Sequence, residues 1–275
     1  MFKIHLKDKV LDLTTPLVMG ILNATPDSFF KGSRMEEIDH GVQKAIEMAN
    51  LGAAILDIGG QSTRPGAVLI TEAMEIERVV PLIEAIHSAL PDMPISIDTY
   101  HANVAKAALD AGALIVNDIS CGNFDPKMMD VVVKNQAGYI GMHQTGGPES
   151  MHQVASRSDI MKELLAYFNF KKAQFAASGL TEWIIDPGFG FSKSMTENFT
   201  IVKSLSQLKE VDLPILLGVS RKSSIYKTLG VDADAALNGT TVVNTIGLLG
   251  GANILRVHDV KEAKEAILLM NQMNA

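Results

Sequence analysis

Residues capable of acid–base chemistry and anion binding recur in this sequence where short apolar segments end. The acidic and amide residues at these positions are Asp57, Asp98, Asn117, Asp118 and Asp186. The cationic residues at or near them are Arg64, Lys222, Arg256 and His258. Carboxylates and an amide that converge can bind a divalent metal, transfer protons or hold the amino and imino edge of a heterocycle through paired hydrogen bonds. Cations grouped in a chain of net charge −7 indicate an anion-binding site.

Among the chemistries open to the acidic set, recognition of a heterocycle is favoured. Glu is absent from the ends of the apolar segments, and a metal cage built only from protein ligands normally uses more carboxylate or imidazole than these ends supply. For Asp57, Asp118 and Asp186 a structural role stays open, because Asp commonly caps the helix that follows it. A protein nucleophile is not indicated, since the sequence has no Gly-x-Ser-x-Gly elbow and Cys121 has no nearby His.

Eight apolar segments rich in Val, Ile and Leu position these side chains. They are Leu17–Leu22, Ala53–Leu56, Ile95–Ile97, Leu114–Val116, Tyr139–Met142, Trp183–Ile185, Ile215–Val219 and Ile254–Val257. Stretches of helical character separate them, and alternating strands and helices predict a parallel sheet that is buried on both faces. Eight such units predict an α/β fold, the (β/α)₈ TIM barrel, in which residues at the carboxyl ends of the strands converge on one face. Residues 2–13 alternate in polarity and predict a short N-terminal β-hairpin.

The connections between the predicted elements also fit a barrel enzyme. The predicted helices cover residues 35–51, 71–90, 101–110, 126–135, 159–178, 223–229, 235–249 and 260–273, with a further helix beginning near Thr196. Long irregular loops follow the strands, whereas most connections from a helix to the next strand are very short. Since about 250 residues are typical of one barrel, we expect residues 1–275 to form a single domain.

The composition excludes several classes of protein. Apolar residues make up 47% of the chain and charged residues 20%, as in a packed globular protein rather than a disordered one. The net charge of −7 argues against nucleic acid or an anionic membrane as partner, and no apolar stretch reaches the length of about 18 residues that a membrane span needs. The single cysteine excludes an intrachain disulfide and fits a reducing compartment, so we expect a cytoplasmic protein.

The sequence around every predicted strand end resembles the dihydropteroate synthase family, a group of pterin-binding TIM barrels. The resembling segments are Met19–Phe29, Gly59–Gly66, Ser96–Thr99, Val116–Asp118, Gly141–His143, Asp186–Phe191, Ser220–Ser223 and Arg256–Asp259. They occur in the family's order and extend over nearly the whole chain. The resemblance implies a transferase of folate biosynthesis that condenses 6-hydroxymethyl-7,8-dihydropterin pyrophosphate with p-aminobenzoate, giving 7,8-dihydropteroate and pyrophosphate through a pterin methylene cation. It also implies Mg²⁺ as cofactor, a homodimer and inhibition by sulfonamides.

The resemblance further implies a role for individual residues of this chain. Catalysis would use Lys222, Asp98 and Asp186. The pterin would contact Asp98, Asn117, Met142, Asp186, Gly218 and Lys222. The pyrophosphate would contact Arg64, Arg256 and His258. The p-aminobenzoate would contact Thr63, Pro65, Phe189 and Ser223. The metal would lie near Asn23.

The first loop of this chain departs from the family pattern. The family commonly has Ser-Asp-Gly-Gly after the Ser-Phe pair, whereas this chain has Phe30-Lys31-Gly32-Ser33. Lys31 therefore replaces a carboxylate, and we expect an effect on closure of this loop and on sulfonamide binding rather than on the pterin or pyrophosphate residues. Two alternatives stay open: a methyltransferase that uses methyltetrahydrofolate and a corrinoid partner, and a pterin-binding protein without activity. The cationic set argues against the first, because its substrate carries no diphosphate.

Overall fold

Strands and helices alternate along the chain in the computed structural model, which describes residues 2–24, 34–61, 68–151, 153–155 and 157–273, the side chain of Arg34 excepted. The strands are β1 (Lys3–Leu6), β2 (Lys9–Asp12), β3 (Leu17–Asn23), β4 (Ile55–Gly59), β5 (Ile95–Asp98), β6 (Ile115–Asp118), β7 (Gly138–Met142), β8 (Ile184–Asp186), β9 (Leu216–Leu217) and β10 (Ile254–Val257). The helices are α1 (Arg34–Asn50), α2 (Glu72–Ala89), α3 (Ala102–Asp110), α4 (Met128–Lys134), α5 (Ile160–Ala177), α6 (Met195–Lys203), α7 (Ser223–Leu229), α8 (Leu237–Gly250) and α9 (Val260–Met273). Two 3₁₀ segments, η1 (Leu205–Val211) and η2 (Asp234–Ala236), complete the described elements.

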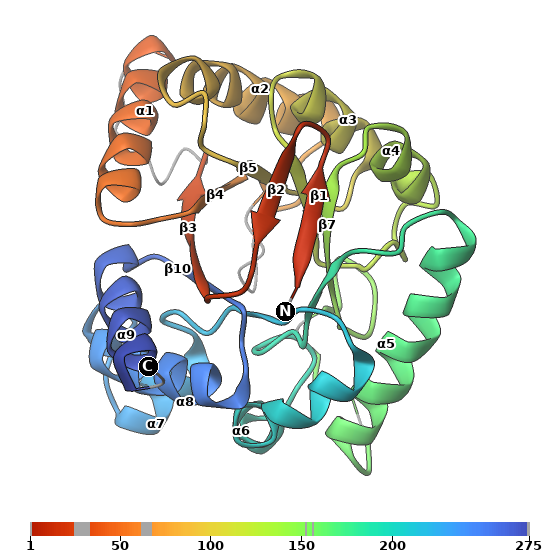
Figure 1. Ribbon diagram of the computed structural model, residues 1–275, viewed down its shortest axis with the longest axis vertical. Helices are drawn as coiled ribbons and strands as arrows, with labels where there is room; N and C mark the ends of the chain where they lie inside the picture. Colours follow the sequence, from red (N-terminus) through yellow and green to blue (C-terminus); the bar gives the residue numbers. More distant parts are fainter. Residues whose placement is uncertain (1, 25–33, 62–67, 152, 156, 274–275) are drawn as a thin grey trace.

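The parallel strands form a closed barrel. Their order in the sheet is β8-β7-β6-β5-β4-β3-β10-β9, and a parallel bridge between Ile185 and Ile215 joins the two ends of that order. Helices α1 to α9 lie around the sheet (Figure 1). The predicted (β/α)₈ barrel is therefore confirmed. None of the helices in the described ranges is long and apolar enough to cross a membrane.

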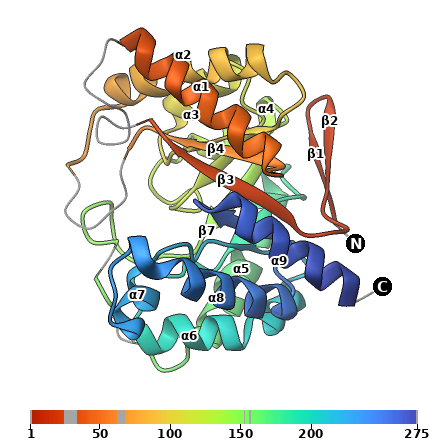
Figure 2. The ribbon, with the colours of Figure 1, turned by 90° about the vertical axis from the view of Figure 1, so that its left-hand side faces the viewer.

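The N-terminal hairpin covers one end of the barrel. Strands β1 and β2 pair antiparallel, as predicted, and the hairpin stands across the barrel axis in Figure 1 and at one side of the molecule in Figure 2. Its apolar residues Ile4, Leu6, Leu11 and Leu13 pack with the first inward-facing residues of the barrel strands. Those strand residues are Met19, Ile55, Ile115, Ile140, Ile184, Leu216 and Ile254. The amino-terminal end of the barrel is thus filled with apolar side chains.

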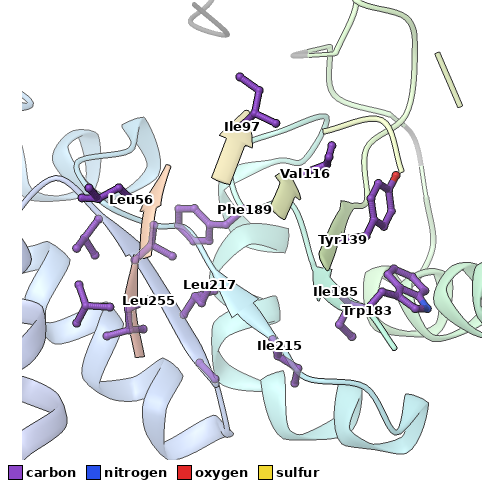
Figure 3. Packing of buried hydrophobic residues seen from close by; sticks show 14 of the residues in the cluster. Leu56, Ile97, Val116, Tyr139, Trp183, Ile185, Phe189, Ile215, Leu217 and Leu255 are labelled. Atoms are coloured by element: carbon purple, nitrogen blue, oxygen red, sulfur yellow. The ribbon is translucent and has the colours of Figure 1, made fainter. Parts of the chain in front are cut away.

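Alternation along the strands separates the core from the site. Successive side chains of a strand point to opposite faces, so residues two positions apart share a face. The outward-facing set, which includes Val116, Tyr139 and Leu255, packs beneath the helices (Figure 3). Most inward-facing positions two residues beyond the apolar layer carry a polar side chain or a glycine: Asp57, Asn117, Asp186, Gly218 and Arg256. The corresponding positions in β3 and β7, Ile21 and Met142, are apolar.

Local caps fix where the helices next to the site begin. The Asp159 carboxylate accepts hydrogen bonds from the N–H groups of Met161 and Lys162 at the start of α5. Helix α6 starts with a capping box, in which Ser194 accepts from the Glu197 N–H and Glu197 accepts from the Ser194 N–H. These caps define the ends of the loops that carry the polar residues.

Candidate active site

A buried ion-pair cluster lies among the inward-facing polar residues of the barrel. Arg256 donates from Nε to Asp57 Oδ2 over 2.6 Å and from Nη2 to Asp98 Oδ2 over 2.5 Å. Asn117 donates from Nδ2 to the same Asp57 oxygen over 3.0 Å. Because this bond assigns the amide nitrogen of Asn117 to Asp57, its carbonyl oxygen points elsewhere in the site. Asp57 therefore orients both a cation and an amide.

The protonation of this cluster follows from burial and pairing. Burial opposes the charge of Arg256, but the carboxylates of Asp57 and Asp98 overcome it and raise the pKa of the guanidinium above its ordinary value. Burial raises the pKa of Asp98 to about 7, although Arg256 favours its ionised form. Asp98 can therefore hold or release a proton near neutral pH.

Asp186 at the end of β8 and Lys222, which precedes α7, form a second set of opposite charges. Asp186 Oδ1 accepts a hydrogen bond from the Gly188 N–H over 2.7 Å, and burial raises the pKa of this carboxyl while Lys222 opposes the rise. Lys222 Nζ donates to the Phe189 carbonyl over 2.5 Å and lies 4.7 Å from the centre of the Phe191 ring. Burial lowers the pKa of Lys222 to about 8, and Asp186 opposes that fall. The ammonium is thus held by the Phe189 carbonyl and the Phe191 ring, and the charge of Asp186 favours its protonated form.

Two glycines give the loop between β8 and α6 its path. Gly188 has φ +71°, and a Cβ there would collide with the carbonyl oxygen of His143. Gly190 has φ +87°, its N–H donates to Asn198 Oδ1 over 2.7 Å, and a Cβ there would lie 3.0 Å from Lys222 Cδ. Both positions require the left-handed conformation that glycine adopts readily. The loop can therefore approach both β7 and Lys222 closely.

Two other glycines leave space between the charged groups. A Cβ at Gly218 would lie 3.8 Å from Arg256 Cβ and 3.9 Å from Asp186 Oδ2. A Cβ at Gly59 would lie 3.8 Å from Asp98 Oδ2 and 3.9 Å from Asn23 Oδ1. The first glycine separates the cation from one carboxylate, and the second leaves an amide and a carboxylate oxygen facing a common point. The absence of side chains at these two glycines therefore keeps the polar groups of both signs uncovered on this side.

Comparison with known proteins identifies the family. Residues 19–258 match the pterin binding enzyme family. The dihydropteroate synthase of Synechocystis sp. is 42% identical over 247 residues, which cover 89% of this chain and 85% of the relative. The chain belongs to the dihydropteroate synthase family. Two solved structures share its fold. The Yersinia pestis dihydropteroate synthase in a sulfonamide drug complex has a TM-score of 0.91 and 36% identity, with 99% of each chain covered. The Xanthomonas albilineans dihydropteroate synthase with 4-aminobenzoic acid has a TM-score of 0.92 and 32% identity, with 99% of this chain and 98% of the other covered.

The pterin residues expected from the dihydropteroate synthase resemblance are brought together. Asp98 and Asn117 are register partners in β5 and β6, and Met142 and Asp186 are register partners in β7 and β8. Met142 is buried in a small apolar cluster at the barrel mouth that also contains Phe191. The polar groups and this apolar wall therefore border the same part of the barrel.

The residues expected at the other two substrates are placed less uniformly. His258 is exposed, with Nδ1 3.1 Å from the Ser220 hydroxyl, and Ser223 is the exposed first residue of α7. The Phe189 side chain is fully buried in the core, 6.4 Å from the Phe199 ring centre, and Figure 3 shows it among the core residues. Its contact with p-aminobenzoate stays a prediction, and in this structure the Phe189 carbonyl accepts the hydrogen bond of Lys222. Thr63, Arg64 and Pro65 lie outside the described residues, as does the first-loop segment with Phe30 and Lys31.

Three other residues differ from the sequence-based expectation. Asp57 was expected where a strand ends, with a helix cap as the alternative, but β4 continues to Gly59 and places it inside the barrel. Asp118 accepts from the Ser120 and Gly122 N–H groups and from the Tyr139 hydroxyl, so its role is to hold a turn. Lys193 was not predicted. It is an almost fully buried residue of the loop between β8 and α6, and no local pattern distinguishes it from the surface lysines.

Proposed function

We propose that the protein condenses 6-hydroxymethyl-7,8-dihydropterin pyrophosphate with p-aminobenzoate to give 7,8-dihydropteroate and pyrophosphate. The observation that carries this proposal is the convergence of Asp98, Asn117, Asp186 and Lys222 at one end of the barrel. The ring edge of a pterin presents several N–H donors beside one carbonyl acceptor. Two carboxylates and an amide carbonyl match the donors, and the Lys222 ammonium matches the carbonyl. A pterin alone accounts for these four residues.

The same residues suit the charge that develops during the reaction. Loss of pyrophosphate leaves positive charge on the pterin methylene carbon, and carboxylates already fixed in place stabilise that charge without reorganising. The amine of p-aminobenzoate then attacks the carbon and gives up a proton. No protein nucleophile takes part in this sequence of steps. Consistent with that, burial raises the pKa of Cys121 to about 12, so its thiol stays protonated.

Arg256 and His258 are proposed to neutralise the departing pyrophosphate. Arg256 gives two of its N–H groups to Asp57 and Asp98, and a guanidinium carries five. Its other three N–H groups can donate to phosphate oxygens. His258, exposed beside Ser220 at the end of β10, would add a second donor. Arg64 is proposed as a third on the family resemblance alone.

The residues near Asn23 fit a magnesium ion that is held mainly by the substrate. The described residues contain no group of three or more His, Cys, Asp or Glu side chains that could enclose a metal. Mg²⁺ commonly takes one or two protein oxygens, several waters and phosphate oxygens. Asn23 Oδ1 and Asp98 Oδ2 face a common point beyond Gly59, which suits that arrangement. When bound there, Mg²⁺ would offset the charge of the diphosphate.

The central experiment measures pyrophosphate release from the purified protein with Mg²⁺. We expect release only when both the pterin diphosphate and p-aminobenzoate are present, because without the amine the cation recombines with the pyrophosphate held beside it. Release that is independent of p-aminobenzoate would contradict the synthase reaction. Binding of the pterin without turnover would favour the inactive pterin-binding alternative, and methyl transfer from methyltetrahydrofolate would favour the corrinoid-dependent one.

We also propose that the protein is a homodimer through α8 and α9. Val242, Ile246 and Leu249 share one face of α8 and are 51%, 42% and 67% exposed, while Leu268 and Leu269 of α9 are 55% and 66% exposed. We expect Ile246→Glu with Leu249→Glu to shift the sedimentation coefficient from dimer to monomer. Met35→Glu on α1, where the methionine is also exposed, is the control and should leave it unchanged. A monomeric wild-type protein would contradict the proposal.

A further inference from the structure

We propose that Lys193 is a positioning residue that fixes the loop between β8 and α6, and through it Asp186 and Lys222. This inference rests on the proposed function, because its consequence is a change in how the pterin is bound. Lys193 does not itself line the pterin positions described above. Lys193 lies near the end of this loop, and its side chain joins the loop to the residue that follows β7.

The Lys193 side chain makes two backbone contacts from a buried position. Its Nζ donates to the His143 carbonyl and to the Phe191 carbonyl, each over 3.0 Å, and the residue is 6% exposed. An ammonium removed from water is costly unless hydrogen bonds replace the lost hydration, so these two carbonyls determine its position. In turn the ammonium holds Phe191 of the loop against His143 of the neighbouring strand.

The contacts of Lys222 depend on that loop. Its Nζ donates to the Phe189 carbonyl, and the Phe191 ring lies beneath the same ammonium. Both partners therefore belong to the segment whose last part Lys193 fixes. If the Phe191 carbonyl is released, the ring and the Phe189 carbonyl are no longer held in the geometry that Lys222 requires.

Lys193 also affects the protonation of Asp186. The Gly188 N–H donates to Asp186, and the Cβ position of Gly188 is only 3.0 Å from Lys193 Nζ, so the two charged groups flank one residue. Burial raises the pKa of Asp186, and the Lys193 ammonium is among the groups that lower it. Removal of that ammonium is expected to raise the Asp186 pKa further.

The other charged groups that face Lys193 lie in β8, in α5, in the loop before α5 and directly before α7. Asp186 and Glu163 favour its charged form, whereas Arg157 and Lys222 oppose it, and burial lowers the pKa of Lys193 to about 7. Below that pH the Lys193 ammonium is charged and favours the ionised form of Asp186. Arg157 is itself held by Glu163 over 3.0 Å and by the Ser192 carbonyl over 2.7 Å. His143 is uncharged, since burial lowers its pKa to about 2.

The test compares Lys193→Met with Lys171→Met, a matched removal of another buried lysine. Lys171 is 3% exposed and donates to Asn123 Oδ1 over 2.7 Å, away from the β8 loop. We expect Lys193→Met to lower kcat/KM for the pterin diphosphate by about 10- to 100-fold, as a small misplacement of binding groups can do. We also expect the acid limb of the kcat/KM profile to move up by about 0.5 to 1 pH unit, because Asp186 must be ionised to accept a pterin N–H. Lys193→Arg should restore much of the kcat/KM value and much of the original position of the acid limb.

Two further measurements keep the inference falsifiable. Lys193→Gln retains N–H donors without the charge, so it should shift the acid limb even if Lys193→Met does not fold. Calorimetry of pterin diphosphate binding, without p-aminobenzoate, measures the loss of pterin affinity in the absence of turnover. It therefore separates failure of this inference from failure of the proposed reaction. An acid limb and a pterin affinity that match those of Lys171→Met, in a variant of lowered Tm, would overturn the positioning role.

Discussion

Replacing Lys222 with Ala is expected to lower kcat/KM for the pterin diphosphate by about 100- to 1,000-fold, the usual effect of removing one preorganised donor. The ammonium is fixed by the Phe189 carbonyl and by the Phe191 ring, so no neighbouring cation can take its position. Loss of the cation also leaves Asp186 with one fewer group that favours its ionised form. The measurement is steady-state pyrophosphate release at varied pterin concentration.

The control for this substitution lies on the same helix. Lys227 is exposed in the last turn of α7, so Lys227→Ala removes an equal charge from the same element without touching the site. We expect kcat/KM to change by less than twofold there. Equal effects of the two substitutions would show that Lys222 acts only through the net charge of this region.

Asp57→Ala is expected to lower the free energy of unfolding by about 3–5 kcal/mol, because it removes one of the two carboxylates that compensate the buried Arg256 guanidinium. Arg256 would lose its Nε acceptor, and the Asn117 amide would lose the oxygen that orients it. Turnover should also fall, since both side chains belong to the proposed site. Urea denaturation gives the first quantity, and pyrophosphate release gives the second.

An exposed ion pair supplies the comparison for Asp57. Lys106 and Asp110 are paired one turn apart on α3, and both side chains are more than half exposed. Asp110→Ala should change the free energy of unfolding by less than about 1 kcal/mol, as is usual for surface pairs. If Asp57→Ala cost no more than this, Arg256 would not depend on Asp57 for its position.

The barrel could be predicted from the sequence because its signal is periodic and local. Apolar segments of strand length, separated by helical stretches, define both the number of strands and the end at which polar residues meet. The position of Asp57 was not predictable in the same way. Its acceptor role depends on Arg256, which is 199 residues away, and a carboxylate ends an apolar segment in sequence even where the strand continues through it.

The orientation of loop side chains was the least predictable part of the site. Phe189 and Phe191 stand two residues apart in one motif, yet the first ring enters the core and the second lies against Lys222. Gly188 and Gly190 determine this difference through backbone conformations that leave no apolar pattern. Lys193 escaped prediction for a similar reason, since lysine is normally exposed and its partner His143 is 50 residues away.

The hairpin that covers the amino-terminal end of the barrel determines how substrates enter and products leave. With that end filled by Leu6, Leu13 and the apolar layer above them, the polar layer can be reached only from the opposite end. Two substrates and two products must therefore use one opening. In the proposed function the pterin contacts the deepest groups, so it would enter before p-aminobenzoate. The fold would then impose an order on substrate entry.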